Sequence, residues 1–544
     1  MAIKNLKTFY FIIALCLLSS VAAWAQSDKR QENLQKAMQL VETIRLGEDD
    51  PGDFYNAACY FALAGETDKA FEYLEKGIQQ GYSNVGHLKQ DSDLISLHTD
   101  KRWADMIVKA EAKKKEIESV FYNQKDFWDN PALKTAYQAN LSEDEKIAGL
   151  SKLWSEAKYN FVNFDLIPDL NWDAVYLSYI PKVRETRSTL EYYRVLMEFI
   201  AKLRDGHTGI SMPKQLSDEA FARPLIRTRL VEDKVLITRV LSEDLKKNNI
   251  EAGLEITEID GVPVKKYAEE KVKPFASAST PQDLETRIYN YQLLSGSAKN
   301  PVELTLRDAK GNLFKKTVVR ATVEEQNKVG STAQPMEYKM LPGNVAYVAL
   351  NTFGNDRAAE MFAEKYDEIS KADAIIFDVR ENGGGNSSVG WNILGYLTDK
   401  PFGTSKWYTR QYRPSFRAWE RPQSVYGQNQ SWAANGKNLY TKSVVVLTSP
   451  RTYSAAEDFT LAFSILKRGT IIGEATGGSS GQPLFIGLPG GGGARICTKR
   501  DQFPDGRDFV GKGIQPDKTV KQTVADFRNG RDTVLEAALK ELKK

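Results

Sequence analysis

Two short apolar runs, each followed by a turn and a helical segment, constrain the fold of this chain most. They are residues 374–377, Ala-Ile-Ile-Phe, and residues 444–447, Val-Val-Val-Leu. A strand that is apolar at every position has to be covered on both faces, as in a parallel sheet between layers of helices. The loops at the carboxyl ends of such strands usually carry the functional site. The sequence therefore predicts a C-terminal βαβ-rich core with its site in these two loops.

The second of these loops places a serine at the start of a helix. Residues 448–457 read Thr-Ser-Pro-Arg-Thr-Tyr-Ser-Ala-Ala-Glu, and Ser454 stands at the junction between turn and helix. The amides of a first helical turn are unpaired, so this position suits a nucleophile whose oxyanion those amides stabilise. The alternative is a plain helix N-cap, a position that serine commonly fills. This segment alone favours the N-cap.

A serine nucleophile usually needs a base, and the chain has three histidines, His87, His98 and His207. His207 follows a strongly patterned helix over residues 189–203. Gly206 stands where a left-handed C-cap glycine is expected, so we expect His207 on a short turn held by the helix. A structural or surface histidine is the alternative. We assign no chemistry to the other two histidines.

The loop after the first apolar run is rich in glycine, with Asn-Gly-Gly-Gly at residues 382–385. Glycines let the backbone approach a ligand closely and point its amides inward. A phosphate cradle or a plain turn is the alternative. A P-loop is excluded because no Gly-Lys-Ser/Thr follows, and a dinucleotide-binding fingerprint fails on spacing.

The first 25 residues predict an export signal, with two lysines, an apolar stretch and a small-x-small cleavage site at residues 23–25. We therefore expect a periplasmic or secreted protein. Removing this segment leaves two cysteines, Cys59 and Cys497, which are too few for a disulfide framework. No later run approaches the roughly 20 apolar residues of a membrane span.

Charge and ligand spacing exclude two further classes of function. The whole chain has a formal net charge of only +3, so nothing favours binding to nucleic acid. Neither the cysteines nor the histidines have the spacing of zinc ligands, and we expect no metal and no cofactor.

Residues 53–107 have the pattern of a helical hairpin broken at Gly65 and Gly81. The stretch over residues 55–74 is similar to a tetratricopeptide unit. One or two such units do not form a long solenoid. We expect a packing element that can also serve as a binding surface for a protein partner.

Short strands follow from about residue 221. Residues 253–264 and 302–306 alternate at period two, with a turn at Asp260-Gly261. The segment over residues 253–264 resembles the strand, turn and strand of PDZ domains, which capture an extended chain end at a sheet edge. A generic β module is the alternative.

Three motifs in order resemble the carboxy-terminal processing serine peptidases. They are Asp-Gly-His-Thr at 205–208, the glycine-rich segment at 377–385 and the serine segment at 448–457, supported by Gly-Glu-Ala-Thr at 473–476 and Gly-Lys-Gly-Ile-Gln-Pro-Asp at 511–517. The resemblance covers about residues 143–520 and implies a ClpP/crotonase-like peptidase core. It implies Ser454 as nucleophile and the amides of Gly384, less certainly Gly383, and Ala455 as an oxyanion hole.

One branch of that family has a lysine base where this chain has Ser479. The histidine of Asp-Gly-His-Thr instead resembles the tricorn-like branch, which implies His207 as the base. That branch also has a serine before the histidine and a glutamate near the last motif, positions that are Gly206 and Val510 here. Asp508, two residues before Val510, is the candidate carboxylate to orient the imidazole.

We therefore expect a multidomain α/β protein with an α-helical N-terminal part, a PDZ-like β module and a βαβ-rich peptidase core. The expected segments are a signal peptide (1–25), a tetratricopeptide-like helical domain (26–120), a helical domain carrying His207 (121–215), a PDZ-like domain (216–325), a serine peptidase core (326–525) and a C-terminal helix (526–544).

The expected function is that of an exported serine endopeptidase, which cleaves peptides or the carboxy-terminal regions of proteins through an acyl-enzyme. The alternative is a catalytically inactive peptidase-fold scaffold or ligand-binding protein that uses the PDZ-like and tetratricopeptide-like modules.

Overall fold

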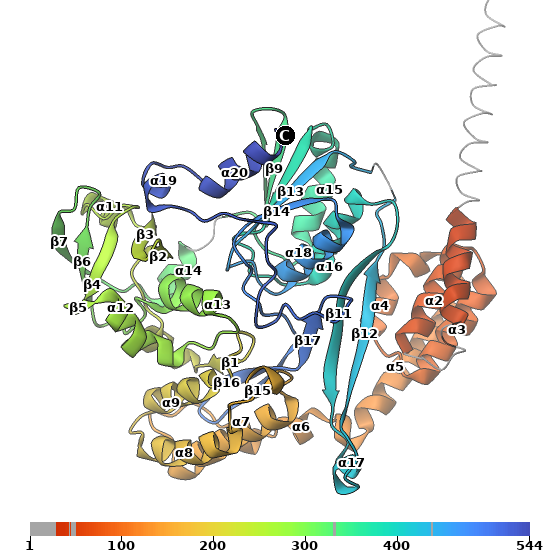
Figure 1. The fold of residues 1–544 in the computed structure, drawn as a ribbon. Helices are drawn as coiled ribbons and strands as arrows, with labels where there is room; N and C mark the ends of the chain where they lie inside the picture. Colours follow the sequence, from red (N-terminus) through yellow and green to blue (C-terminus); the bar gives the residue numbers. More distant parts are fainter. Residues whose placement is uncertain (1–28, 43, 45–50, 330–332, 437–438, 544) are drawn as a thin grey trace, which may run out of the picture. The chain divides into compact units, whose positions relative to one another are not determined.

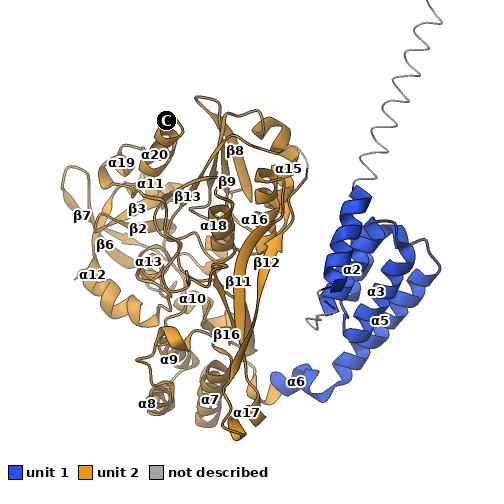
Figure 2. Ribbon diagram, turned by 45° about the vertical axis from the view of Figure 1, so that its right-hand side comes forward, with its two compact units in different colours: residues 1–130 blue, residues 131–544 orange. Residues whose placement is uncertain are grey.

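The computed structural model describes residues 29–42, 44, 51–329, 333–436 and 439–543. The chain divides into two compact units, residues 1–130 and 131–544, which Figure 2 draws in two colours. The expected export signal lies outside the described residues. Within the described part of the chain, no helix is both long and apolar enough to cross a bilayer.

The first unit is helical. Helices α2 (Pro51–Leu63) and α3 (Thr67–Gln80) form the hairpin that the sequence predicted, and α4 (Val85–Gln90) and α5 (Arg102–Ser119) follow. Gly65 and Gly81 both have positive φ angles, +75° and +119°, which explains the breaks after the two helices. Ala58 and Ala70 are fully buried between the helices, so small side chains let the backbones approach closely.

The core of the second unit is a six-stranded sheet, shown in Figure 1. Its order is β18-β14-β13-β10-β9-β8, and every neighbouring pair is parallel except β8 with β9. The strands are β8 (Met336–Leu341), β9 (Val345–Leu350), β10 (Ala374–Asp378), β13 (Ser443–Thr448), β14 (Gly469–Gly473) and β18 (Lys518–Thr519). The two apolar runs are therefore the central neighbours β10 and β13.

Helices cover both faces of this sheet, as continuous apolar strands require. Ile375 and Phe377 of β10 pack with the core formed by α15 (Arg357–Ile369), α16 (Ser387–Leu394) and α18 (Ala455–Leu466). Ile376 faces the opposite side, where α20 (Thr533–Glu541) packs. Because β10 and β13 are parallel neighbours, the loops after them lie side by side, and the Tyr453 amide donates to the Asn382 carbonyl at 3.0 Å.

A helical layer brings His207 to this core. Helices α7 (Glu143–Asn160), α8 (Trp172–Glu185) and α9 (Thr189–Ala201) pack against the hairpin of β15 (Pro483–Gly487) and β16 (Gly493–Cys497). The chain leaves α9, passes His207 and enters β1 (Gly209–Ser211), which pairs with β16. His207 is therefore held between a helix and a paired strand.

The β module inserted between β1 and the core is an antiparallel sheet of order β2-β3-β4-β6-β7. Its strands are β2 (Ile226–Val231), β3 (Lys234–Val240), β4 (Glu255–Ile259), β6 (Val302–Arg307) and β7 (Leu313–Val318), and the short β5 (Val262–Pro263) pairs with β4. The predicted turn at Asp260-Gly261 joins β4 to β5, with both residues at positive φ.

The β module is anchored to the loop that follows β14. Thr280 Oγ1 donates to the Gly477 carbonyl at 2.8 Å, and Gln282 Nε2, in α13 (Pro281–Thr286), donates to the Thr476 carbonyl at 3.0 Å. Arg229 of β2 pairs with Glu474 at 2.9 Å. These contacts tie the β module to the loop that also carries Ser479.

Candidate active site

Ser454 stands between β13 and α18 in a backbone conformation that is unusual for a non-glycine residue, with φ +55° and ψ −123°. It occupies the N-cap position of α18 and forms a capping box with Glu457, whose carboxylate accepts from the Ser454 amide at 3.2 Å. Ser454 Oγ also lies 3.1 Å from His207 Nε2. The strained turn therefore aims the hydroxyl at the imidazole, a contact that a plain N-cap does not require.

The His207 ring is buried and has a partner on each nitrogen. Nε2 faces Ser454, and Nδ1 lies 2.8 Å from Ser479 Oγ. One face of the ring stacks on Tyr453, with centroids 5.2 Å apart and planes 11° apart. Burial lowers the pKa of His207 to about 3, and the charges of Arg495, Arg287 and Lys499 act in the same direction. The imidazole is therefore neutral and able to accept a proton.

Position 206 requires glycine because the structure leaves no space there for a side chain. The prediction that Gly206 is a left-handed C-cap is wrong. The residue with positive φ after α9 is Arg204, at +49°. A Cβ atom on Gly206 would stand 1.8 Å from Tyr453 Oη and 2.6 Å from Arg287 Nη2. A serine therefore does not fit before the histidine, because Tyr453 and Arg287 fill that position.

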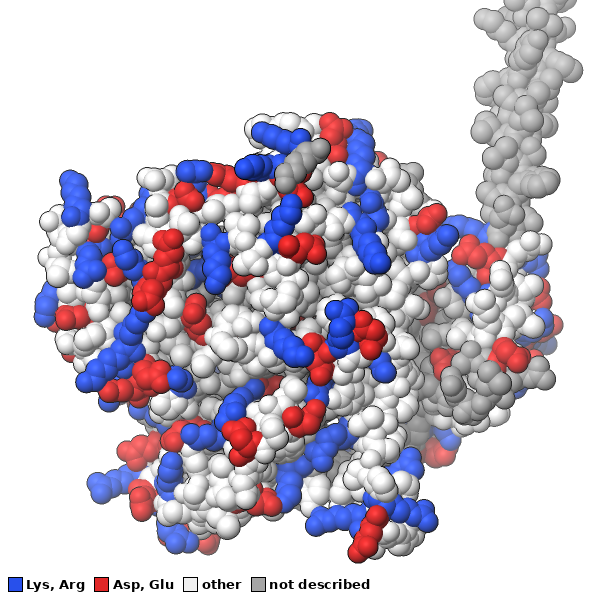
Figure 3. Space-filling view, in the orientation of Figure 1, with Lys and Arg blue, Asp and Glu red and all other residues white. Residues whose placement is uncertain are grey.

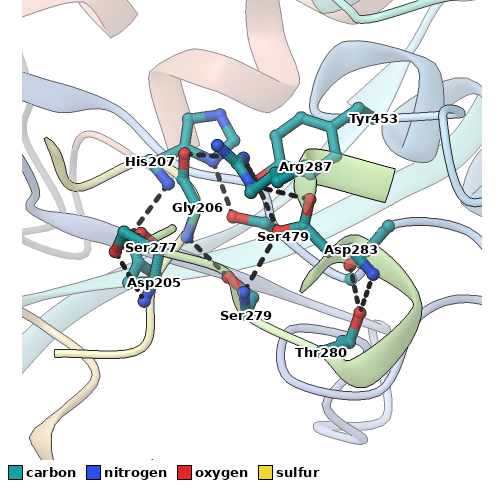
Figure 4. Close-up of polar contacts among 12 residues, drawn as sticks. Asp205, Gly206, His207, Ser277, Ser279, Thr280, Asp283, Arg287, Tyr453 and Ser479 are labelled. Carbon is teal, nitrogen blue, oxygen red and sulfur yellow. Dashed lines mark hydrogen bonds and ion pairs between the residues drawn. The ribbon is translucent and has the colours of Figure 1, made fainter. Parts of the chain in front are cut away.

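Arg287, from the β module, locks this corner of the site, as Figure 4 shows. Its guanidinium donates to the Gly206 carbonyl at 3.1 Å, to Tyr453 Oη at 2.9 Å and to Asp283 Oδ1 at 2.8 Å. On the other side, the Asp205 carboxylate accepts from the His207 amide at 3.0 Å and from Thr208 Oγ1 at 2.8 Å. The histidine loop is thus fixed by side chains from three segments.

Asp508 does not orient the imidazole. Its carboxylate accepts from Gln502 Nε2 at 2.7 Å and lies 3.8 Å from Arg500 Nε, so it belongs to a separate polar group. Val510 is buried in a small apolar cluster with Leu461. The contact with Nδ1 comes from Ser479, which the sequence marked only as the position where a lysine is missing.

Glu457 joins the nucleophile to the Ser479 loop. Its fully buried carboxylate accepts from the amides of Gly478 at 2.7 Å, Ser479 at 2.9 Å and Ser454 at 3.2 Å, and from Thr476 Oγ1 at 2.5 Å. Burial raises the pKa of Glu457 to about 8, and the four donors oppose that rise. The serine segment at 448–457 ends at this residue, but the sequence predicted no role for it.

The amides expected to form an oxyanion hole are not equivalent. In the described residues, the Ala455 amide donates no hydrogen bond, whereas the Gly384 amide donates to Asn382 Oδ1 at 2.9 Å. The Gly384 amide is therefore occupied in this structure, and its role as an oxyanion donor stays a prediction. A Cβ on Gly384 would stand 2.7 Å from Ser454 Cβ, so only glycine allows this approach. The Gly383 amide makes no hydrogen bond in this part of the chain.

A cavity of about 440 Å³ opens at the pair of Ser454 and His207. Its lining includes Gly383, Arg287 and Arg495. Its volume lies within the range of small-ligand and peptide side-chain pockets.

The remaining candidate residues lie elsewhere. His87 contacts Tyr55 Oη at 3.2 Å, and His98 stacks on Trp103 with centroids 4.3 Å apart, both in the first unit. Cys59 and Cys497 are buried free thiols in different units. Among the residues that the structure describes, no group of three or more histidine, cysteine, aspartate or glutamate side chains could hold a metal ion.

Comparison with known proteins places the core in a family. Residues 344–520 match the model of peptidase family S41. A carboxyl-terminal-processing protease of Synechocystis sp. is 24% identical over 410 residues, which cover 71% of this chain and 83% of that protein. The chloroplastic C-terminal processing peptidase of Tetradesmus obliquus is 26% identical over 297 residues, 53% of this chain and 56% of that protein.

A third relative, putative tricorn protease homolog 2 of Streptomyces coelicolor, is 24% identical over 399 residues, 68% of this chain and 30% of that protein. The solved structure of mature CPAF complexed with lactacystin superimposes with a TM-score of 0.57 at 14% identity, covering 74% of this chain and 98% of that one. This last likeness shows a shared fold alone.

The expected mixed α/β fold class and the family resemblance are confirmed, whereas the PDZ-like and tetratricopeptide-like assignments stay predictions. The matched segment contains Ser454, Glu457, Ser479 and the glycine-rich loop. His207 precedes it and reaches the core through β1. The core over residues 344–520 is therefore that of peptidase family S41, and the similar proteins include carboxyl-terminal processing proteases, which are serine-type peptidases.

Proposed function

We propose that this protein is a serine endopeptidase in which Ser454 is the nucleophile and His207 the base. The proposal rests on one observation, the 3.1 Å contact between His207 Nε2 and Ser454 Oγ beside an open cavity. The neutral imidazole takes the hydroxyl proton while Oγ attacks a peptide carbonyl, and the same proton then passes to the leaving amine. Water hydrolyses the acyl-enzyme with His207 again as base.

The oxyanion that forms on attack needs hydrogen-bond donors at the serine. The Ala455 amide stands at the first turn of α18, where its dipole and its unoccupied N–H favour negative charge. Gly384 supplies a second donor only if its amide leaves Asn382 Oδ1. Gly383 borders the cavity with an unoccupied amide and needs no such rearrangement.

We further assign Ser479 as the residue that positions the base. Its hydroxyl accepts from His207 Nδ1–H, which leaves Nε2 unprotonated toward Ser454. A hydroxyl orients the ring as a carboxylate does, but it does not stabilise the imidazolium with a full charge. The neutral partner fits a site in which Arg287 and Arg495 already disfavour protonation of the ring.

The substrate in this proposal is a peptide or the carboxy-terminal region of a protein. In the β module, β2 and β7 are the outermost strands in the sheet order β2-β3-β4-β6-β7. The extended end of a polypeptide can add to such an edge as a further strand. The hairpin of α2 and α3 is a candidate surface for a protein partner.

Export through residues 1–25 belongs to the same proposal, and a mature amino terminus other than residue 26 would argue against it.

Digestion of a peptide library tests the proposed roles. The wild-type protein is expected to cleave, Ser454→Ala to be inactive, and His207→Ala to lose a factor on the order of 10³ or more in kcat/KM. His87→Ala, a histidine of the other unit, is the control and should cleave normally. Cleavage that persists in Ser454→Ala contradicts the proposal, and a folded wild type without any cleavage favours the scaffold alternative.

Removing the Ser479 hydroxyl tests its positioning role. Ser479→Ala is expected to lower kcat by about 10- to 100-fold, equivalent to about 1–3 kcal/mol, with little change in KM. The matched control is Ser480→Ala, whose buried hydroxyl donates to Asp501 at 2.9 Å, away from the imidazole. Equal losses in the two variants, or a loss confined to KM, would assign Ser479 a merely structural role.

The acid limb of the pH profile tests the state of the base. Because the folded pKa of His207 is about 3, the ring stays neutral at every pH well above 3. The kcat/KM profile is therefore expected to change less than about twofold between pH 5 and 7. An acid limb with its midpoint near 6.5 would contradict the buried, neutral base.

The lowered pKa of His207 also affects the stability of the fold, because the unfolded chain binds a proton at His207 near pH 6.5 and the folded chain does not. Its contribution to the free energy of unfolding therefore decreases as the pH falls from 6.5 toward 3 and is constant above 6.5. Activity assays below pH 5 accordingly need a parallel unfolding measurement.

A further inference from the structure

A second cavity, of about 830 Å³, lies where the β module meets the core. It is bordered by residues of β2 and β3, by the loop that carries Asn351 and by the segment before Ser454. Five arginines line it, a set that we call the arginine cavity: Arg223, Arg227, Arg229, Arg239 and Arg451. On the face that Figure 3 shows, basic and acidic side chains are interspersed.

Acidic residues balance only part of this charge. Arg229 pairs with Glu474 at 2.9 Å, and Arg451 pairs with Glu381 at 2.5 Å. Arg223 donates to neutral groups only, Gln326 Oε1 at 2.6 Å and the Tyr291 carbonyl at 3.0 Å.

Two further arginines of the cavity also lack an acidic partner. The Arg227 side chain donates to the Ile226 carbonyl at 3.3 Å, and the Arg239 side chain makes no hydrogen bond or ion pair with a described residue. Burial lowers the pKa of Arg227 to about 10, and the charges of Arg223, Arg239 and Arg451 contribute to that decrease. Gathering uncompensated cations in one cavity is unfavourable, and a bound anion would relieve the repulsion.

The arginine cavity is adjacent to the site of the proposed reaction. Tyr291 and Arg451 border both this cavity and the one at Ser454. Arg451 is also only three residues before the serine. A polypeptide that lies across Ser454 can therefore continue past these two side chains into the arginine cavity.

We propose that the arginine cavity binds an acidic segment of the substrate polypeptide and thereby selects substrates that carry aspartate or glutamate beside the cleavage site. Guanidinium groups bind carboxylates through paired hydrogen bonds, which suits them for this recognition. One terminal carboxylate occupies one or two guanidiniums, whereas this cavity offers three without an acidic partner. The volume also exceeds that of the cavity at Ser454. This inference deepens the proposed peptidase function and rests on it.

Binding to the full-length Ser454→Ala protein tests the inference without requiring cleavage. The probes are three fluorescent ten-residue peptides: a Glu-Ala repeat with an amidated carboxy terminus, the amidated Gln-Ala repeat and the Gln-Ala repeat with a free carboxy terminus. The amidated glutamate peptide is expected to bind roughly tenfold more tightly than the amidated glutamine peptide, with a preference that weakens as salt is added.

Two matched pairs of substitutions locate the preference. The double variant Arg227→Gln with Arg239→Gln is expected to reduce the preference for the glutamate peptide from about tenfold to less than about twofold. Arg194→Gln with Arg421→Gln changes the net charge equally at exposed arginines outside both cavities and should retain the preference. If thermal unfolding shows that the first pair is destabilised, Arg239→Gln alone replaces it, because that side chain is exposed.

Three outcomes would overturn the inference. They are equal or negligible binding of the two amidated peptides, a glutamate preference that survives the Arg227 and Arg239 substitutions, and an arginine-dependent gain for the free carboxy terminus that exceeds the gain from glutamate. The last outcome would assign the cavity to a terminal carboxylate. Failure of the peptidase proposal appears separately, as absence of cleavage by the wild type in the library digest.

Discussion

The site depends on one buried carboxylate. Glu457, in the first turn of α18, accepts hydrogen bonds from the amides of Ser454, Gly478 and Ser479 and from Thr476 Oγ1. These bonds connect the turn that carries the nucleophile to the loop that presents Ser479 to His207. Each is a hydrogen bond to a buried group, whose loss typically costs about 1–3 kcal/mol. The geometry of both partners of the imidazole is therefore set from the same side chain.

The three parts of the site come from segments far apart in the sequence, and each is placed by a different element. Parallel pairing of β10 with β13 sets the glycine-rich loop beside Ser454. Pairing of β1 with β16 brings His207 to the core. Arg287 of the β module closes the corner behind Gly206. The β module therefore contributes directly to the imidazole environment, which gives a physical route by which a ligand on that module could affect the site.

Much of this arrangement could be predicted from the sequence, because it follows from local patterns. The apolar runs of β10 and β13 identify the sheet, and three short motifs identify Ser454 and His207. The remaining features depend on tertiary contacts that no local pattern encodes. Gly206 is required because Tyr453 and Arg287 fill the space beside it, and Ser479 reaches the imidazole because Glu457 holds its loop. Asp508 had the expected chemistry and sequence position, but the fold directs it toward Gln502.

The central claim is that the neutral His207 activates Ser454 as a nucleophile. Reaction with a fluorophosphonate, followed by peptide mass spectrometry, tests this claim most directly because it reports the modified atom without any assumption about the substrate. A single adduct on Ser454 is expected in the wild type, and this adduct should be lost in His207→Ala protein that remains folded. An unmodified Ser454 in folded wild-type protein, or equal modification after the histidine is removed, would contradict the account.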